Sequence, residues 1–187
     1  MNPNNFLSLD LEMNQTLENS HIIQIGAVAG NLQTGQVLER LSVLVKIPEP
    51  LNPFIVTLTS ITDEMLQTEG VDLLTAYKRL ELFHLRNHCH VNPITWGGGD
   101  SREIHEQVKL LYPDAFHEQR YVFGRRWIDI KTIYQMWCYS QGIKMQSGLA
   151  KSMTKMGLKF NGRKHWAVDD AEQTFVLAHH LLKKFRS

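Results

Sequence analysis

Two acidic residues near the start of the chain, Asp10 and Glu12, have the spacing of a paired carboxylate site. Residues two apart on a β-strand point to the same face, so these carboxylates would lie side by side. Such a pair repels itself unless a cation lies between the groups, and hard divalent cations prefer oxygen ligands. The alternative is an exposed strand face on which both acids are harmless, and this short pattern alone is common.

A second candidate is Asp100, which follows Trp96 and the glycines at 97–99. The pattern predicts the end of a strand and the start of a helix, which is where open α/β sheets bind their ligands. Glycines there allow a backbone or a ligand to approach closely. The competing interpretation is a helix cap, because Asp100 and Glu103 have the spacing of a capping box.

A third candidate is the segment from His165 to Asp170. If the last helix begins near Ala167, His165 lies on the preceding loop and Asp170 lies in the first helical turn. The loop histidine could then lean over a site that the helix carboxylate anchors. Asp169 competes for this role, although Asp170 lies nearer the packed side of the helix. Both acids could instead only complement the helix dipole.

These residues need a sheet and helices to bring them together. Alternation and β-branched content predict strands at 6–12, 21–29, 36–47, 91–96 and 127–130. Helical spacing predicts helices that begin near 62 and that span 72–87, 100–111, 130–139, 149–156 and 167–185. Prolines at 48, 50 and 53 are expected to end the third strand and open a loop. The order predicts an α/β fold with a mixed five-stranded sheet, an antiparallel flank and covering helices.

Composition bounds the function further. The chain has 187 residues, 43% of them hydrophobic, so we expect a single domain over 1–187. A formal net charge of +1 argues against binding by bulk positive charge, so local charge must carry any nucleic-acid contact. Cys89 and Cys138 lack the spacing of a zinc site or a disulfide scaffold. With no apolar run long enough for a membrane span, we expect a soluble, cytoplasmic protein.

The three candidates occur in a recognisable order: DxE on the first strand, Asp100 after a glycine turn, and H-x4-D at the last helix. In this the sequence resembles the DEDDh branch of the DEDD 3′–5′ exonucleases, over nearly the whole chain. Segment 21–28 resembles the family's "IIQIGAV" strand, and segment 58–66 resembles its "LTGITDEML" segment. Thr95-Trp96-Gly97 is most similar to the branch that trims RNA 3′ ends, which includes the sporulation-inhibitor type.

The resemblance implies an RNase H-like fold and a metal-dependent exonuclease. It would hydrolyse single-stranded RNA or DNA from the 3′ end and release nucleoside 5′-monophosphates. Two divalent ions, Mg²⁺ or Mn²⁺, would be bound by Asp10, Glu12, Asp100 and Asp170. His165 would act as the general base, because histidines ordinarily titrate near neutral pH.

Substrate contacts are expected at Met13, Ile61, Thr62, Trp96, Arg163 and Lys164. The sequence departs from the family at two of the places where the terminal nucleotide would be held. Met13 replaces the usual threonine of DxET, and Ser60 replaces the usual glycine before Ile61. The two arginines and the tryptophan at 125–127 are a further candidate contact with nucleic acid, and the alternative is solvated loop charge beside a core tryptophan.

Two other functions fit parts of the pattern. One is a non-catalytic nucleic-acid-binding or protein-binding module on the same fold, and the other is a metal-dependent phosphatase or nucleotide hydrolase. The intact set of five site residues argues against a pure binding module, which needs no carboxylate cluster. Analysis of the products formed with Mg²⁺ separates the three functions.

Overall fold

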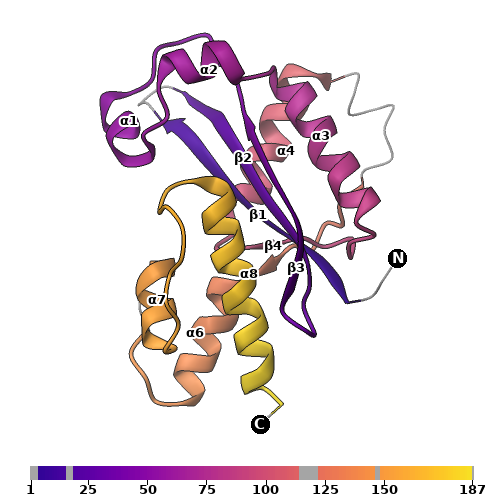
Figure 1. Cartoon of the computed structure of the whole chain (residues 1–187), viewed down its shortest axis with the longest axis vertical. Helices are drawn as coiled ribbons and strands as arrows, with labels where there is room; N and C mark the ends of the chain where they lie inside the picture. The colour runs from indigo at the N-terminus through magenta and orange to yellow at the C-terminus, as the bar shows by residue number, and fades with distance from the viewer. Residues whose placement is uncertain (1–3, 16–18, 114–121, 146–147, 187) are drawn as a thin grey trace.

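The structure is a computed structural model that describes residues 4–15, 19–113, 122–145 and 148–186. Its five-stranded sheet has the order β3-β2-β1-β4-β5 (Figure 1). An antiparallel meander is formed by β1 (Asn5–Gln15), β2 (Ser20–Asn31) and β3 (Gln36–Leu44). Two short strands, β4 (Ile94–Thr95) and β5 (Ile128–Asp129), then add in parallel beside β1. The expected mixed α/β sheet with an antiparallel flank is therefore confirmed.

Seven helices lie within the described residues: α1 (Pro53–Thr59), α2 (Asp63–Glu69), α3 (Leu73–Arg86), α4 (Gly99–Leu111), α6 (Ile130–Ser140), α7 (Leu149–Lys155) and α8 (Ala167–Lys184). Helices α3 and α4 pack on the sheet, and α8 packs across it with α6 and α7 against its side (Figure 1). None of the helices that the structure describes is long and apolar enough to cross a membrane.

Alternation along β1 separates the two faces of the sheet. Leu7, Leu9 and Leu11 are buried in the core that also contains the apolar residues of α3 and α4. Each fully buried leucine stabilises the fold by about 1.5–3 kcal/mol, so the register of this strand is strongly determined. The same alternation directs Asp10 and Glu12 to the opposite face, where α8 packs.

The start of α8 approaches the sheet closely because β2 carries a glycine there. Gly26 pairs with Asp10 across the β1–β2 ladder. A Cβ atom on Gly26 would lie 2.0 Å from the backbone carbon of Ala167, so a larger residue would push α8 away. The Gln24 side chain on the same strand accepts a hydrogen bond of 3.0 Å from the Ala167 N–H. These contacts place the first turn of α8 directly over the β1 carboxylates.

Two expectations from the sequence were wrong in detail. The segment after Pro50 was expected to be a loop, but α1 forms there with Pro53 in its first turn. Proline is tolerated at that position because its missing N–H has no partner inside the helix, and the Asn52 side chain caps the Phe54 N–H at 2.9 Å. The strand expected over 91–96 is only β4, since its regular pairing is limited to Ile94 and Thr95.

Candidate active site

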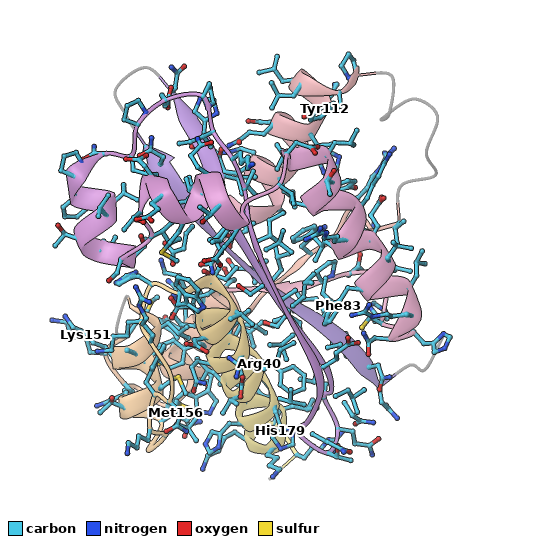
Figure 2. The ribbon with its side chains drawn as sticks, turned by 45° about the horizontal axis from the view of Figure 1, so that its top comes forward. Arg40, Phe83, Tyr112, Lys151, Met156 and His179 are labelled. Atoms are coloured by element: carbon cyan, nitrogen blue, oxygen red, sulfur yellow. The ribbon has the colours of Figure 1, made fainter. Side chains whose placement is uncertain are left out.

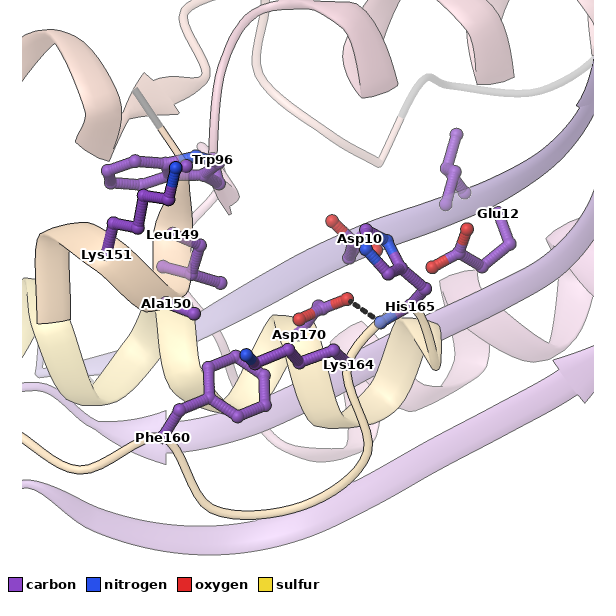
Figure 3. Close-up of a pocket in the computed structure, with 12 residues that line it drawn as sticks. Asp10, Glu12, Trp96, Leu149, Ala150, Lys151, Phe160, Lys164, His165 and Asp170 are labelled. Atoms are coloured by element: carbon purple, nitrogen blue, oxygen red, sulfur yellow. Dashed lines mark hydrogen bonds between the residues drawn. The ribbon is translucent and has the colours of Figure 1, made fainter. Parts of the chain in front are cut away.

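A cavity of about 470 Å³ opens above the middle of β1 (Figure 3). Its acidic wall is formed by Asp10 and Glu12 of β1 and by Asp170 of α8. Lys164 and His165 come from the loop before α8, and Trp96 directly follows β4. The remaining lining residues are Leu11, Gly148, Leu149, Ala150, Lys151 and Phe160. Elements far apart in the sequence therefore meet at one hollow.

Three polar side chains converge in this cavity. Ligand atoms of Glu12, His165 and Asp170 all lie within 4.8 Å of one another. The His165 backbone N–H donates a hydrogen bond of 2.8 Å to Oδ2 of Asp170, the dashed line in Figure 3. His165 has a left-handed backbone, with φ of 59°, a conformation that is uncommon outside glycine and that histidine adopts more readily than most residues. The loop is thus fixed with the imidazole beside two carboxylates.

Crowding and burial disfavour the charged forms of these acids. Burial raises the pKa of Asp10 well above its usual range, and the charges of Asp100, Asp170 and Glu12 raise it further. Burial, followed by the charges of Asp170 and Asp100, raises the pKa of Glu12 to about 8. Burial also raises the pKa of Asp170 to about 6, against the opposing hydrogen bond from His165.

Asp100 lies beside the cavity, at the start of α4. Burial raises its pKa to about 7, while hydrogen bonds from the backbone of Leu11 and from its own backbone lower it. Asp100 does not line the cavity, although its charge acts on both Asp10 and Glu12. It is not the helix cap either, because the cap position of α4 belongs to Gly98. The capping interpretation of Asp100 was therefore wrong.

A polar clamp holds the loop before α8. Asp169 accepts a hydrogen bond of 2.9 Å from the Arg163 N–H and forms an ion pair with Arg40, which reaches over from β3 (Figure 2). The Arg163 guanidinium donates to the Thr59 carbonyl and lies 4.7 Å from the ring centre of Trp166. Asp169 and Asp170 thus have separate tasks: Asp169 holds the loop, and Asp170 faces the cavity.

The expected substrate contacts divide into two groups. Trp96 and Lys164 line the cavity, whereas Met13, Ile61, Thr62 and Arg163 do not. Met13 packs on the core face of β1, and Ile61 is fully buried in a separate apolar cluster. Thr62 caps α2 by accepting a hydrogen bond of 3.2 Å from the Met65 N–H. Contact between these four residues and a substrate stays a prediction.

Reasoning from the sequence missed one wall of the cavity. Lys151 and its neighbours on α7, together with Phe160, line the side away from Glu12 (Figure 3). No residue type at these positions signals a site, because a lysine and an apolar pair on a short helix are ordinary. Only the packing of α7 against α8 brings them there.

The residues of this site suit hard divalent cations. Three carboxylates and an imidazole share one cavity, and each carboxyl is pushed towards its neutral form by burial and by its neighbours. Positive charge placed among them would remove that repulsion. Oxygen-rich donor sets of this kind favour Mg²⁺ or Mn²⁺ over softer metals.

A mixed sheet of this topology, with acidic residues on its central strand and α8 laid across them, defines the RNase H-like exonuclease fold. The sequence model of the exonuclease family of RNase T matches residues 7–177. The chain therefore belongs to this exonuclease family.

Individual relatives agree with the family. ERI1 exoribonuclease 2 from Mus musculus is 26% identical over 180 residues, which cover 87% of this chain. The chain spans about a quarter of the length of that curated relative, since the match covers 25% of it.

Solved structures share the fold. The nuclease domain of 3′hExo, described as a DEDDh family member bound to rAMP, has a TM-score of 0.80 at 19% identity, with 98% of this chain and 94% of that chain covered. Cell-death related nuclease 4 has a TM-score of 0.81 at 18% identity, with 97% of this chain and 64% of that chain covered. At these identities the likeness concerns the fold alone.

Proposed function

We propose that the protein is a 3′–5′ exonuclease that hydrolyses single-stranded RNA or DNA and releases nucleoside 5′-monophosphates. The observation that carries this proposal is the convergence of Glu12, Asp170 and His165 within 4.8 Å in an open cavity beside Asp10. The name of the mouse relative, an exoribonuclease, and the description of 3′hExo as a DEDDh family member support this proposal. We further propose that residues 1–187 act as one exonuclease domain.

Asp10, Glu12, Asp100 and Asp170 would together hold two divalent ions. When bound, such ions supply positive charge that stabilises the attacking and the leaving oxygens of a phosphodiester. That positive charge would favour the ionised form of the four carboxylates, against the burial and crowding that raise their pKa values. The strands and helices beneath the carboxylates hold them together. Asp100 is kept near Asp10 by its hydrogen bond from the Leu11 backbone.

His165 is the proposed general base. Its side chain lies beside Glu12 and Asp170, and its backbone is fixed by the hydrogen bond to Asp170. The imidazole would accept a proton from the attacking water, a step that needs a base within hydrogen-bond reach of that water. Its exposed position on the loop leaves room for the substrate's last phosphate to enter.

The other end of the cavity would hold the terminal nucleotide. Trp96 offers an aromatic face on which a base can stack, and Lys151 and Lys164 offer cations for phosphate.

Cys89 and Cys138 are free and buried. Reduced thiols support the proposal that the protein works in the cytoplasm.

The proposal is tested by digestion of one oligonucleotide sequence as single-stranded RNA, single-stranded DNA and duplex, with Mg²⁺. A 5′ label should yield a ladder that shortens one nucleotide at a time, and free 5′-monophosphates should accumulate. Blocking the 3′ end should stop the reaction, whereas blocking the 5′ end should not. Release of inorganic phosphate would indicate a phosphatase, and binding without products would indicate a non-catalytic module.

A further inference from the structure

A second cavity, of about 460 Å³, lies outside the candidate active site, between α4 and the segment that leads into β5. We call it the basic groove. One wall is a face of α4 that presents Arg102, His105, Glu106 and Lys109, at spacings of three and four residues. The opposite wall contains Arg125 and Trp127.

The basic groove carries a surplus of positive charge. Arg102, Lys109 and Arg125 line the groove with one acid, Glu106. Arg102 also forms an ion pair of 3.2 Å with Glu103, which leaves one net positive charge over these five groups. Lys109 and Arg125 are exposed and form no ion pair within the part of the chain that the structure describes. Burial lowers the pKa of His105, and the charges of Lys109 and Arg125 lower it further, which places both cations near this histidine.

The wall that carries Arg125 is firmly built. Gly124 packs so tightly that a Cβ atom would lie 2.0 Å from the side-chain oxygen of Asn92. The same oxygen accepts a hydrogen bond of 3.3 Å from the Arg126 N–H. Trp127 is anchored by Phe123, with the ring centres 5.7 Å apart. Arg125 therefore projects from a fixed backbone.

An open ledge joins the basic groove to the active site. Trp96 lines the active-site cavity and Ser101 lines the basic groove, with the glycines at 97–99 between them. A Cβ atom added to any of these glycines would meet nothing within 4 Å. The turn is also held in place, because the Gly97 N–H donates a hydrogen bond of 2.9 Å to Asp129. These three residues present no side chain of their own to a phosphate backbone that crosses the ledge.

We propose that the basic groove binds the phosphate backbone of a single-stranded polynucleotide whose 3′ end occupies the active site, a proposal that rests on the proposed function. The stretch of α4 from Ser101 to Lys109 is about 12 Å long at 1.5 Å per residue. It can accompany three or four stacked nucleotides at about 3.4 Å each. A substrate too short to cross the ledge cannot contact the basic groove. The proposal therefore predicts that the contribution of the groove to binding affinity appears only for longer substrates.

The test compares Lys109→Glu/Arg125→Glu with the control Lys78→Glu/Arg79→Glu. The control residues are exposed on α3, line neither cavity, and give the same change in net charge. Binding of 5′-fluorescein single-stranded RNAs of three and fifteen nucleotides is measured by anisotropy in EDTA, which prevents cleavage. Turnover of the three-nucleotide RNA is measured separately with Mg²⁺.

The groove variant should bind the fifteen-nucleotide RNA at least tenfold more weakly, while the control changes less than twofold. The slope of log affinity against log salt should fall by about 1.4, or about 0.7 for each lost phosphate contact. Binding and turnover of the three-nucleotide RNA should not change. Equal binding of the long RNA by all three proteins, or equal losses for both lengths, would overturn the proposal. Length-dependent binding without release of mononucleotides by the wild type would overturn the proposed function and leave the groove standing.

Discussion

Replacing Glu12 by glutamine should stabilise the metal-free protein at pH 8. The substitution keeps the shape of a side chain that is only 9% exposed and removes its charge. The pKa of Glu12 rises from 4.5 to about 8 in the fold, and each pKa unit corresponds to about 1.4 kcal/mol. Ionising Glu12 in the folded state therefore costs about 5 kcal/mol, an upper bound because its neighbours can take up protons instead.

The sign of the pH dependence follows from proton uptake. Between pH 4.5 and about 8 the folded protein holds a proton on Glu12 that the unfolded chain has lost. The free energy of unfolding must then fall as pH rises through this window, and the contribution of Glu12 to this fall ends above pH 8. Asp100, with a pKa raised to about 7, and Asp170, with a pKa raised to about 6, make the fall steeper at its acid end.

The assay is urea unfolding in EDTA at several values between pH 5 and 8.5, repeated with Mg²⁺. Glu12→Gln should gain at least about 2 kcal/mol over the wild type at pH 8 and show a flatter pH profile. Mg²⁺ should stabilise the wild type more than the variant. Glu81→Gln is the control, because Glu81 is also buried with a raised pKa but lies on α3 away from the site. If Glu12→Gln is less stable at pH 8, or responds to Mg²⁺ like Glu81→Gln, the assignment of Glu12 is refuted.

Three further predictions concern the loop, the helix end and the strand. His165→Asn should lower turnover by about 10²–10⁴-fold with little change in melting temperature, because asparagine tolerates the left-handed backbone at φ of 59°; normal turnover removes His165 from the mechanism. Ser60→Gly should raise the free energy of unfolding by about 0.5–1 kcal/mol in urea, because Ser60 ends α1 in a left-handed conformation with φ of 54°; an unchanged value would contradict this. Met13→Thr should cost about 1–3 kcal/mol in the same assay, since Met13 packs against the core. The Michaelis constant of the Met13→Thr variant should change more than its affinity for Mn²⁺. If the affinity for Mn²⁺ changes more, Met13 does not lie near the nucleotide pocket.

The order of the strands was predictable from the sequence, and so was the meeting of Asp10, Glu12 and Asp170 at one cavity. Alternation at Leu7, Leu9 and Leu11 fixes which face of β1 is buried, and this places Asp10 and Glu12 on the other face. The start of α8 at Ala167 puts Asp170 in the first turn, as its position after the loop indicated. Both predictions depend only on the types and spacing of residues that are close in the sequence, and such spacing indicates secondary structure and the buried face.

Properties that depend on close packing were not predictable. Gly26 and Ala167 lie in close contact although they are far apart in the sequence, and no sequence pattern at either position predicts this contact. The internal contacts of Arg163 were also not predictable, since its guanidinium donates to the Thr59 carbonyl and lies over the Trp166 ring, two groups that no local pattern brings together. The proline at the start of α1, Pro53, indicated a loop, because proline can either break a helix or begin one.

The most direct test of the central claim is the turnover of Asp10→Asn in saturating Mg²⁺. Burial and the charges of three other carboxylates raise the pKa of Asp10, so ionised Asp10 destabilises the metal-free fold. The account predicts that Asp10→Asn melts at or above the temperature of the wild type in EDTA, and that it releases no mononucleotides from single-stranded RNA or DNA that the wild type degrades. Turnover near that of the wild type, on a preparation with the same melting temperature, would contradict the account.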